Sequence, residues 1–428
     1  MLSHNGGMSG MRSARTLLCI CGLCALSLRL SSQTSSHHKR IVIAASAVLD
    51  GKGGILRNSR MVIEGSKIIE INPKAGPVDY DLRGLTVLPG WIDAHVHLTM
   101  SFGADGKAGG TGTAEEAAYR TASNAWLTLM AGFTTVQSVG SPADVPLRDA
   151  IAKGMLPGPR ILTAIEPLTG RGEQTGTPDE IRAHVRKQKE AGADLIKIYA
   201  AGGMRQGGMT LSQAQLDAAC DEAKKQGLRT LVHAYREAVR AAVLAGCTQV
   251  EHGLGATDDD LKLMAAKGTY FDPQAGLLIE TYIQNKEKYA GTPYFPKTVE
   301  EFAKFAEILP MNRELIERAS KIPGLKIVFG TDAVAGAHGR NAEEFIDRVR
   351  DAGVDPMAAM VSANSLGAEA LGMAGRIGAI APGLEADIIV LDGDPLEDIT
   401  AVRRVVFVMK AGTVYKNAAR SAIPAPLR

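Results

Sequence analysis

Short apolar runs alternate with amphipathic stretches through the middle of the chain. Residues 177–192 and 212–227 place apolar side chains at helical spacing among charged ones. Both stretches end in glycine, which is typical of a helix C-terminus, and the first opens with Thr-Pro-Asp-Glu, typical of a helix start. We therefore expect helices there and strands in the apolar runs, which cover residues 91–98, 133–139, 159–166, 194–200, 229–235, 248–253, 269–274 and 326–333.

Eight strands that alternate with helices are the pattern of a parallel α/β barrel. The predicted fold class is α/β, a (β/α)8 TIM barrel over residues 89–373. The alternative is an open doubly wound sheet. That fold would want a glycine-rich phosphate turn after an early strand, and no turn of the right form is present.

The two ends of the mature chain show a different pattern of apolar and polar residues. Residues 40–88 and 374–428 hold short β-type runs separated by Gly and Asp or Asn turn signals. Strand-rich pieces at opposite ends of a chain can pair, so we expect one small β-sandwich domain built from both.

The first 39 residues look like a leader. Arg12 and Arg15 precede an apolar run over residues 17–28, and a small polar stretch follows. This is the layout of a secretory signal peptide, and the run is short for a membrane span. We expect cleavage between Leu28 and His38, export to the periplasm or the medium, and no stable membrane span after processing. An uncleaved anchor is the alternative.

Net charge and cysteine content narrow the range of partners and of stabilising features that we expect. The 428 residues carry a formal net charge of only +2, which argues against nucleic acid as the main partner. Of five cysteines, only Cys220 and Cys247 lie in the body, so a disulfide framework is not expected to stabilise it.

Polar residues interrupt the apolar runs where barrel strands should end. The active site of such a barrel lies at the C-terminal ends of its strands. Four of the nine histidines fall there, which chance placement rarely produces. The residues concerned are His95, His97, Lys197, His233, His252 and Asp332.

Neutral imidazole and carboxylate groups suit zinc or a similar first-row divalent ion. Lys197 is the odd member, because a protonated amine would repel a metal. A desolvated lysine can lose its proton and react with carbon dioxide, and the resulting carbamate could bridge two ions. Taken singly, each histidine could instead be a hydrogen-bonded strand-end residue, and Lys197 could pair with a carboxylate.

The segments GWIDAHVHL, LIKIYA, LVHAY, VEHG and GTDA, followed by GRIGAIAPGLEADIIVLDGDP, resemble the amidohydrolase superfamily. The resemblance runs from about residue 41 to residue 416. Through TGTPDEIRAHVRKQKEAGADLIKIYAAGG the chain looks most like the imidazolonepropionase-related metal-dependent carboxypeptidases and dipeptidases. That branch includes prolidase-like enzymes and ochratoxin-hydrolysing amidohydrolases.

The resemblance implies a role for each candidate. His95 and His97 would bind the more buried of two metal ions with Asp332, and His233 and His252 would bind the second. Lys197, carboxylated, would bridge both. Asp332 would also take a proton from the attacking water and pass it to the leaving nitrogen. A homo-oligomer is also plausible on this resemblance.

The chain departs from the branch in two segments. Gln137 and Ser138 stand where the branch often has Arg-Asp, and EPLTGRGEQTG replaces a histidine-rich turn after strand three. Both segments are expected to face the substrate, so they bear on its identity.

The resemblance implies a small-molecule amide or dipeptide as substrate, with a free α-carboxylate. Candidates to bind that group are Tyr235, His338 and Arg340, with Arg171 and Arg236 as alternatives. GGMRQGGMT and FDPQAGLL supply Met and Leu, which favours an apolar terminal residue, as in N-acyl amino acids, dipeptides or ochratoxin A. A cyclic-amide or lactone hydrolase, or a barrel that binds without catalysis, are the alternatives.

Overall fold

The protein is described by a computed structural model over residues 40–204, 207–293 and 295–419. The predicted leader, residues 1–39, lies outside the described residues. Within those ranges, no helix combines the length and apolar character needed to cross a lipid bilayer.

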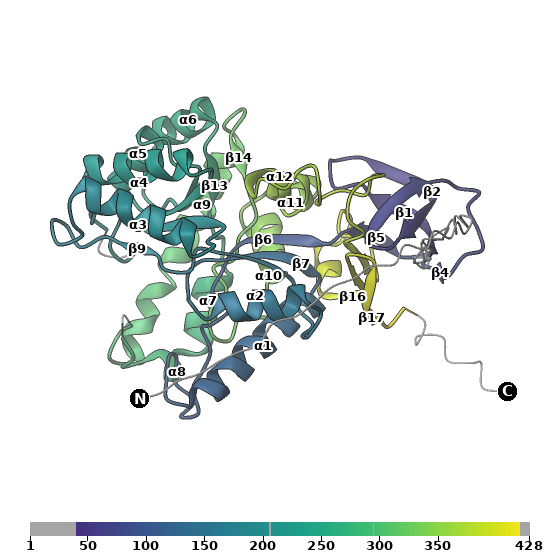
Figure 1. Ribbon diagram of the computed structural model, residues 1–428, viewed down its shortest axis with the longest axis horizontal. Helices are drawn as coiled ribbons and strands as arrows, with labels where there is room; N and C mark the ends of the chain where they lie inside the picture. Colours follow the sequence, from purple (N-terminus) through teal and green to yellow (C-terminus); the bar gives the residue numbers. More distant parts are fainter. Residues whose placement is uncertain (1–39, 205–206, 294, 420–428) are drawn as a thin grey trace, which may run out of the picture. The chain divides into compact units, whose positions relative to one another are not determined.

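Each of the eight apolar runs contains a strand, which confirms the α/β class. The strands form two parallel sheets, one of order β6-β7-β8 and one of order β14-β13-β12-β11-β10-β9 (Figure 1). Their bounds are β6 Trp91–Val96, β7 Phe133–Ser138, β8 Arg160–Thr163, β9 Leu168–Thr169, β10 Leu195–Tyr199, β11 Arg229–Ala234, β12 Gln249–His252, β13 Tyr270–Asp272 and β14 Lys326–Ile327.

Backbone hydrogen bonds link the edges of these two sheets. The N–H of Asp194, next to β10, donates to Thr163 O of β8 at 2.9 Å. On the other side, the N–H of Ala94 in β6 donates to Phe329 O at 2.9 Å, just after β14. The strands therefore follow one another in chain order, as a barrel requires. Complete closure of a (β/α)8 barrel stays a prediction.

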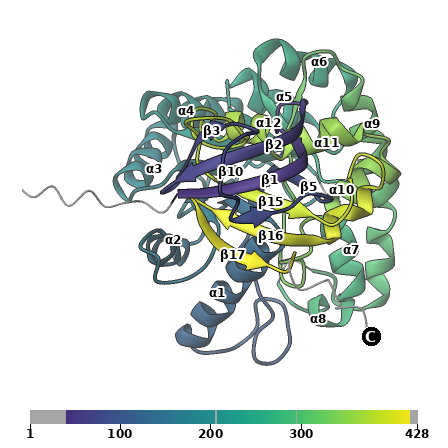
Figure 2. The same cartoon turned by 90° about the vertical axis from the view of Figure 1, so that its right-hand side faces the viewer.

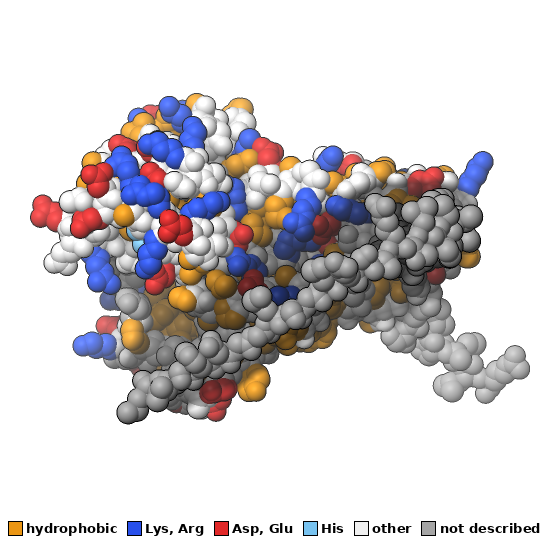
Figure 3. Space-filling model, viewed as in Figure 1, with side chains coloured by type: hydrophobic (Ala, Val, Ile, Leu, Met, Phe, Trp, Pro, Cys, Tyr) orange, Lys and Arg blue, Asp and Glu red, His pale blue; other side chains and the backbone are white. Residues whose placement is uncertain are grey.

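The helices begin where the sequence signals place them. In α3, Thr177 and Glu180 form a capping box with Pro178 in the first turn, and Ser212 and Gln215 do the same for α4. Basic and acidic side chains are interspersed over the face that Figure 3 draws. The helices are α1 Ala114–Met130, α2 Asp144–Ala152, α3 Pro178–Glu190, α4 Gln213–Lys225, α5 Glu237–Leu244, α6 Asp258–Lys267, α7 Leu277–Gln284, α8 Lys286–Tyr289, α9 Ile308–Ser320, α10 Glu343–Ile346, α11 Pro356–Ser362 and α12 Ser365–Ala370, with short η1 Glu300–Phe305, η2 Asp347–Asp351 and η3 Ile399–Arg403.

The two ends of the body form one sheet, as expected. Its eight strands pair in the order β17-β16-β15-β5-β1-β2-β3, with β4 paired to β1, and Figure 2 shows them side by side. A sandwich of two packed sheets stays a prediction. The strands are β1 Arg40–Leu49, β2 Ile55–Glu64, β3 Lys67–Ile71, β4 Tyr80–Asp81, β5 Thr86–Pro89, β15 Ile388–Leu391, β16 Val405–Lys410 and β17 Thr413–Asn417.

Buried ion pairs join this sheet to the parallel strands. Arg160, the first residue of β8, lies 2.9 Å from Asp387 and also contacts the carboxylate of Glu385. A second link is Lys410 of β16, whose ammonium donates to Gly158 O. These contacts tie the base of the parallel strands to the terminal sheet.

A disulfide connects Cys220 of α4 to Cys247, which precedes β12. The sequence expectation that disulfides do not contribute was therefore wrong for this pair. The bond joins neighbouring strand–helix units, and it closes a loop over a sequence separation of 27. It lies among buried apolar residues of the larger core cluster.

The variant Cys220→Ser should lower the free energy of unfolding by about 2–4 kcal/mol, because the unfolded chain regains the entropy of the open loop. Urea unfolding with and without dithiothreitol measures the change. Reductant should destabilise the wild type and leave the variant unaffected, and Cys247→Ser should match Cys220→Ser. Equal stability of wild type and variant would contradict a stabilising role.

Candidate metal centre

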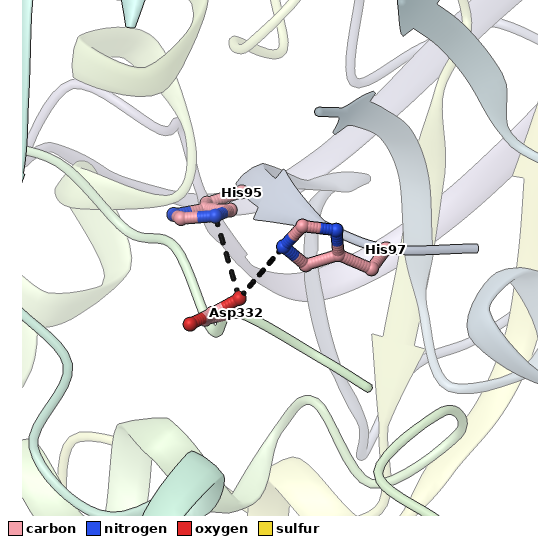
Figure 4. Close-up of side chains that lie close together, drawn as sticks. All are labelled: His95, His97 and Asp332. Atoms are coloured by element: carbon pink, nitrogen blue, oxygen red, sulfur yellow. Dashed lines mark ion pairs between the residues drawn. The ribbon is translucent and has the colours of Figure 1, made fainter. Parts of the chain in front are cut away.

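The end of β6 brings two imidazoles against one carboxylate. His95 Nε2 lies 3.4 Å from Asp332 Oδ1, and His97 Nε2 lies 3.1 Å from the same oxygen. Figure 4 shows both rings directed at Asp332 from the strand end. These three side chains offer ligand atoms close enough together to hold one metal ion.

Lys197 of β10 lies directly beside this group. Its ammonium nitrogen is 3.4 Å from His95 Nε2, and the side chain is completely buried. Burial lowers the pKa of Lys197, although the carboxylates of Glu251 and Asp332 act in the opposite direction. A lowered pKa increases the fraction of neutral amine, which is the form that carbon dioxide requires.

His233 and His252 complete the cluster from β11 and β12. Their ring centroids lie 4.6 Å apart, and His252 is 5.4 Å from His95. His233 Nε2 is 3.2 Å from Gly202 O, so Nδ1 of this ring remains for a metal. His252 Nδ1 is 2.6 Å from Gln274 Oε1, so its Nε2 remains.

Two of the six candidates have a left-handed backbone. The φ angles of His252 and Asp332 are 64° and 51°, values that non-glycine residues rarely adopt. Asp332 is held by its own N–H, which donates to His95 O at 2.8 Å. Strain of this kind concentrates at functional sites because the surrounding structure must enforce it.

Three of the imidazoles, those of His95, His233 and His252, are held in the neutral form that binds metals. Burial lowers the pKa of His233 to about 4, and burial puts the pKa values of His95 and His252 well below the usual range. Burial would raise the pKa of Asp332, but the adjacent rings of His95 and His97 and the side chain of Lys197 together hold it below its usual value. Asp332 is therefore ionised.

This donor set fits divalent metal ions. His95, His97 and Asp332 would hold one ion, His233 and His252 would hold another, and Lys197 reaches the first group. Four imidazole nitrogen donors with one carboxylate match zinc or a similar ion. All six residues that the sequence predicted as ligands meet in this cluster.

A second layer of carboxyl groups lies beneath the ligands, and sequence reasoning did not identify it. The carboxylate of Glu251 contacts His95 Nδ1 closely, and Asp272 Oδ2 lies 3.9 Å from that nitrogen. Burial raises the pKa of Glu251 to about 7 and raises that of Asp272 well above its usual value. The only sequence signal was a lone acidic residue inside each of the apolar runs VEHG and TYFDPQ.

A small pocket opens beside His252. Tyr235, Gln274, Met204, Leu278 and Asn312 line it with that histidine. Tyr235 stacks on the His252 ring at 5.3 Å. The segments expected to face substrate, GGMRQGGMT and FDPQAGLL, do contribute Met204 and Leu278.

The other predicted substrate residues lie elsewhere. His338 is buried, and its Nε2 is 3.3 Å from Met100 O. Arg340 donates to Gln284 Oε1 at 2.7 Å, and Arg171 is exposed. Neither His338 nor Arg340 lines the pocket, so the structure brings only Tyr235 of the three to its wall.

The departure at Gln137 also has a different meaning from the one expected. This side chain is completely buried, donates to Ala94 O at 2.9 Å and accepts from Arg229 at 2.7 Å. It fills the interior between β6, β7 and β11 and therefore does not face a substrate.

Comparison with known proteins agrees with this site. The model of the amidohydrolase family matches residues 86–415. The chain belongs to the amidohydrolase family. As a member of it, the chain is a metal-dependent amide hydrolase, and the six clustered side chains are its candidate metal ligands.

Three relatives place this amidohydrolase more closely. Ochratoxinase of Aspergillus niger is 26% identical over 439 residues, which cover 90% of this chain and 88% of that protein. The imidazolonepropionase of Salinispora arenicola is 26% identical over 386 residues, which cover 80% of this chain and 88% of that protein. The crystal structure of a Xaa-Pro dipeptidase with bound methionine in the active site matches with a TM-score of 0.79 and 31% identity, over 89% of this chain and 100% of that one.

Replacing Lys197 with Ala should reduce activity by about 100-fold or more, because even partners of metal ligands cost 10–100-fold when removed. Short carboxylic acids such as acetate or formate should restore part of it, since they can occupy the space of a carbamate. Steady-state rates with increasing acid measure the rescue. Lys262→Ala, an exposed lysine that pairs with Asp259, is the matched control. A Lys197→Ala variant with an unchanged rate and metal content would refute the role of Lys197 as a ligand.

Proposed function

We propose that this amidohydrolase removes a C-terminal amino acid from an acyl or peptidyl amide, as a carboxypeptidase or dipeptidase does. The observation that supports it best is the position of a small neutral pocket against His252, next to the candidate metal ligands. A scissile amide held at the ligands would place the adjoining part of the substrate against the residues that line that pocket. Ochratoxin A, an amide of phenylalanine, belongs to this substrate class.

The chemistry divides between the ligands and Asp332. When bound, two divalent ions activate a water molecule and polarise the scissile carbonyl. Asp332 is ionised and faces the same space as His95 and His97, so its carboxylate can accept a proton from the attacking water. The same group can then deliver that proton to the leaving nitrogen.

The pocket favours an apolar or neutral side chain. Met204 and Leu278 supply aliphatic surface, and the ring of Tyr235 supplies a flat apolar wall. The related Xaa-Pro dipeptidase holds methionine, an apolar amino acid, in its active site. We therefore expect a hydrophobic residue such as methionine, phenylalanine or proline at the released end.

A free carboxylate would need a donor near this pocket. Tyr235 lines its wall and carries a hydroxyl that can donate. Arg236 follows it directly, with a strained φ of 49°, and its guanidinium lies against Gly207. His338 and Arg340 do not belong to the lining of this pocket.

A cyclic-amide or lactone hydrolase is the second candidate. Among the described residues, no lysine or arginine lines the pocket. A substrate without a carboxylate would not need such a cation. The similarity to an imidazolonepropionase points the same way.

Further proposals concern the metal, the compartment and the assembly. We expect zinc at both positions and a carbamate on Lys197. The Cys220–Cys247 bond supports export, because disulfides persist mainly in oxidising compartments. A signal peptide over residues 1–39 and a homo-oligomer are proposed on sequence grounds alone.

Activity on matched substrates tests this function. Metal-loaded protein would be offered N-acyl amino acids, dipeptides and ochratoxin A, each beside its carboxamide analogue. Hydrolysis confined to free-carboxylate substrates is the expected result. Equal turnover of the blocked analogues, or turnover of cyclic substrates alone, would favour the second candidate.

Asp332→Asn should lower kcat by about 100- to 10,000-fold, the usual contribution of a proton-transfer group. Its metal content, measured by atomic emission, should stay close to that of the wild type because the amide oxygen can still ligate. A variant that keeps its activity would remove Asp332 as the proton carrier. Loss of metal together with activity would instead show that Asp332 acts mainly as a metal ligand.

A further inference from the structure

Asp272 occupies the centre of the polar layer beneath the metal ligands. It is the last residue of β13 and is completely buried, and it lies opposite Glu251 of β12 in the strand register. A carboxylate taken out of water is costly unless several donors surround it. Three polar side chains do so here: Gln274, Glu251 and Arg348.

The first branch runs from Asp272 to His252. Gln274 Nε2 lies 3.1 Å from both the backbone oxygen and Oδ2 of Asp272. Because the amide nitrogen is committed to Asp272, the amide oxygen must face His252 Nδ1, at 2.6 Å. An oxygen there accepts only from a protonated Nδ1, which leaves the Nε2 lone pair of His252 free for a metal.

The second branch runs from Asp272 to His95. The carboxyl groups of Asp272 and Glu251 lie opposite one another on neighbouring strands, close enough that each shifts the pKa of the other. Gln249 donates to Glu251 Oε1 at 2.8 Å, so Oε2 is the oxygen that faces His95 Nδ1. His95 Nδ1 is therefore in contact with Glu251, and Nε2 of the same ring lies on the side of Asp332 and Lys197.

The third branch fixes the carboxylate itself. Arg348 is buried, and its Nη2 lies 3.3 Å from Asp272 Oδ1 and 2.7 Å from Pro273 O. The same guanidinium donates to Val328 O and Gly330 O in the segment that leads to Asp332. Gly330 leaves room for the carboxylate, since a Cβ there would lie 2.0 Å from Asp272 Oδ2.

We propose that Asp272 is a positioning residue that orients His95 and His252 together, and so couples the two metal positions of this centre. The inference rests on the metal-binding function of the site and is independent of the substrate. His95, Glu251 and Asp272 could in principle hold an ion themselves. The guanidinium of Arg348 at Asp272 disfavours that reading, because a cation already neutralises the carboxylate.

The variant Asp272→Asn tests the coupling. Its amide cannot accept from both Arg348 and Gln274 while it also faces Glu251, so Gln274 should turn and present N–H to His252. Apoprotein would be titrated with Co²⁺, whose visible absorption reports ligand geometry, and the bound metal would be counted by atomic emission. We expect two ions per chain in the wild type. The variant should bind at least one of them about 10- to 100-fold more weakly, with altered absorption bands.

Asp387→Asn is the matched control, since Asp387 is also a buried aspartate paired with an arginine, but at the terminal sheet. It should bind Co²⁺ as the wild type does. A normal Co²⁺ titration and spectrum in Asp272→Asn would overturn the proposal. One ion per wild-type chain would overturn the coupling of two positions. Neither readout uses a substrate, so a wrong substrate class would leave both results intact.

Two further variants keep the test decisive if Asp272→Asn does not fold. Gln274→Met interrupts only the branch to His252, and Glu251→Gln only the branch to His95. Each should weaken Co²⁺ binding about 10-fold or more. In a folded Asp272→Asn background, Gln274→Met should add little, because both changes remove the same constraint. Wild-type Co²⁺ affinity in both single variants would overturn the proposal.

Discussion

Burial of ionisable side chains around a single point is the constraint on which this structure depends. The candidate metal centre brings imidazoles, a carboxylate and a lysine into one space from which water is largely excluded. Each such group is costly to bury without a partner. Consequently the strands beneath the ligands carry polar residues at positions where a barrel would otherwise have aliphatic ones.

That polar layer gives the site its rigidity. Asp93 accepts from Thr331 and Asn341, and Glu344 accepts from the backbone N–H groups at the start of α7. Glu344 also accepts from Arg348, which contacts Asp272, so the start of α7, with Leu278 of the pocket wall, is linked to the polar layer by buried hydrogen bonds. The ends of the strands carry the candidate metal ligands, whereas residues of loops and helices line the pocket beside them.

The sequence was sufficient to predict that these six side chains would meet, because each interrupts an apolar run near the end of a strand. A single histidine at the end of an apolar run is weak evidence, but four of them in an alternating pattern indicate one common strand edge. Asp272, Gln274 and Asn312 could not be found this way, since their roles depend on which neighbouring strand or helix they face. Arg348 and Glu344 are spaced like an exposed helical ion pair, but they are buried. Arg340 looked available in the sequence but bonds to Gln284.

The left-handed backbone at His252 and Asp332 has an evolutionary consequence. Each such residue costs of order 1–3 kcal/mol relative to a relaxed conformation. Glycine at either position would release that cost, so the metal-free fold should gain stability from the very substitutions that destroy the enzyme. Selection for robustness alone would therefore erode this centre, and only selection for turnover can maintain it.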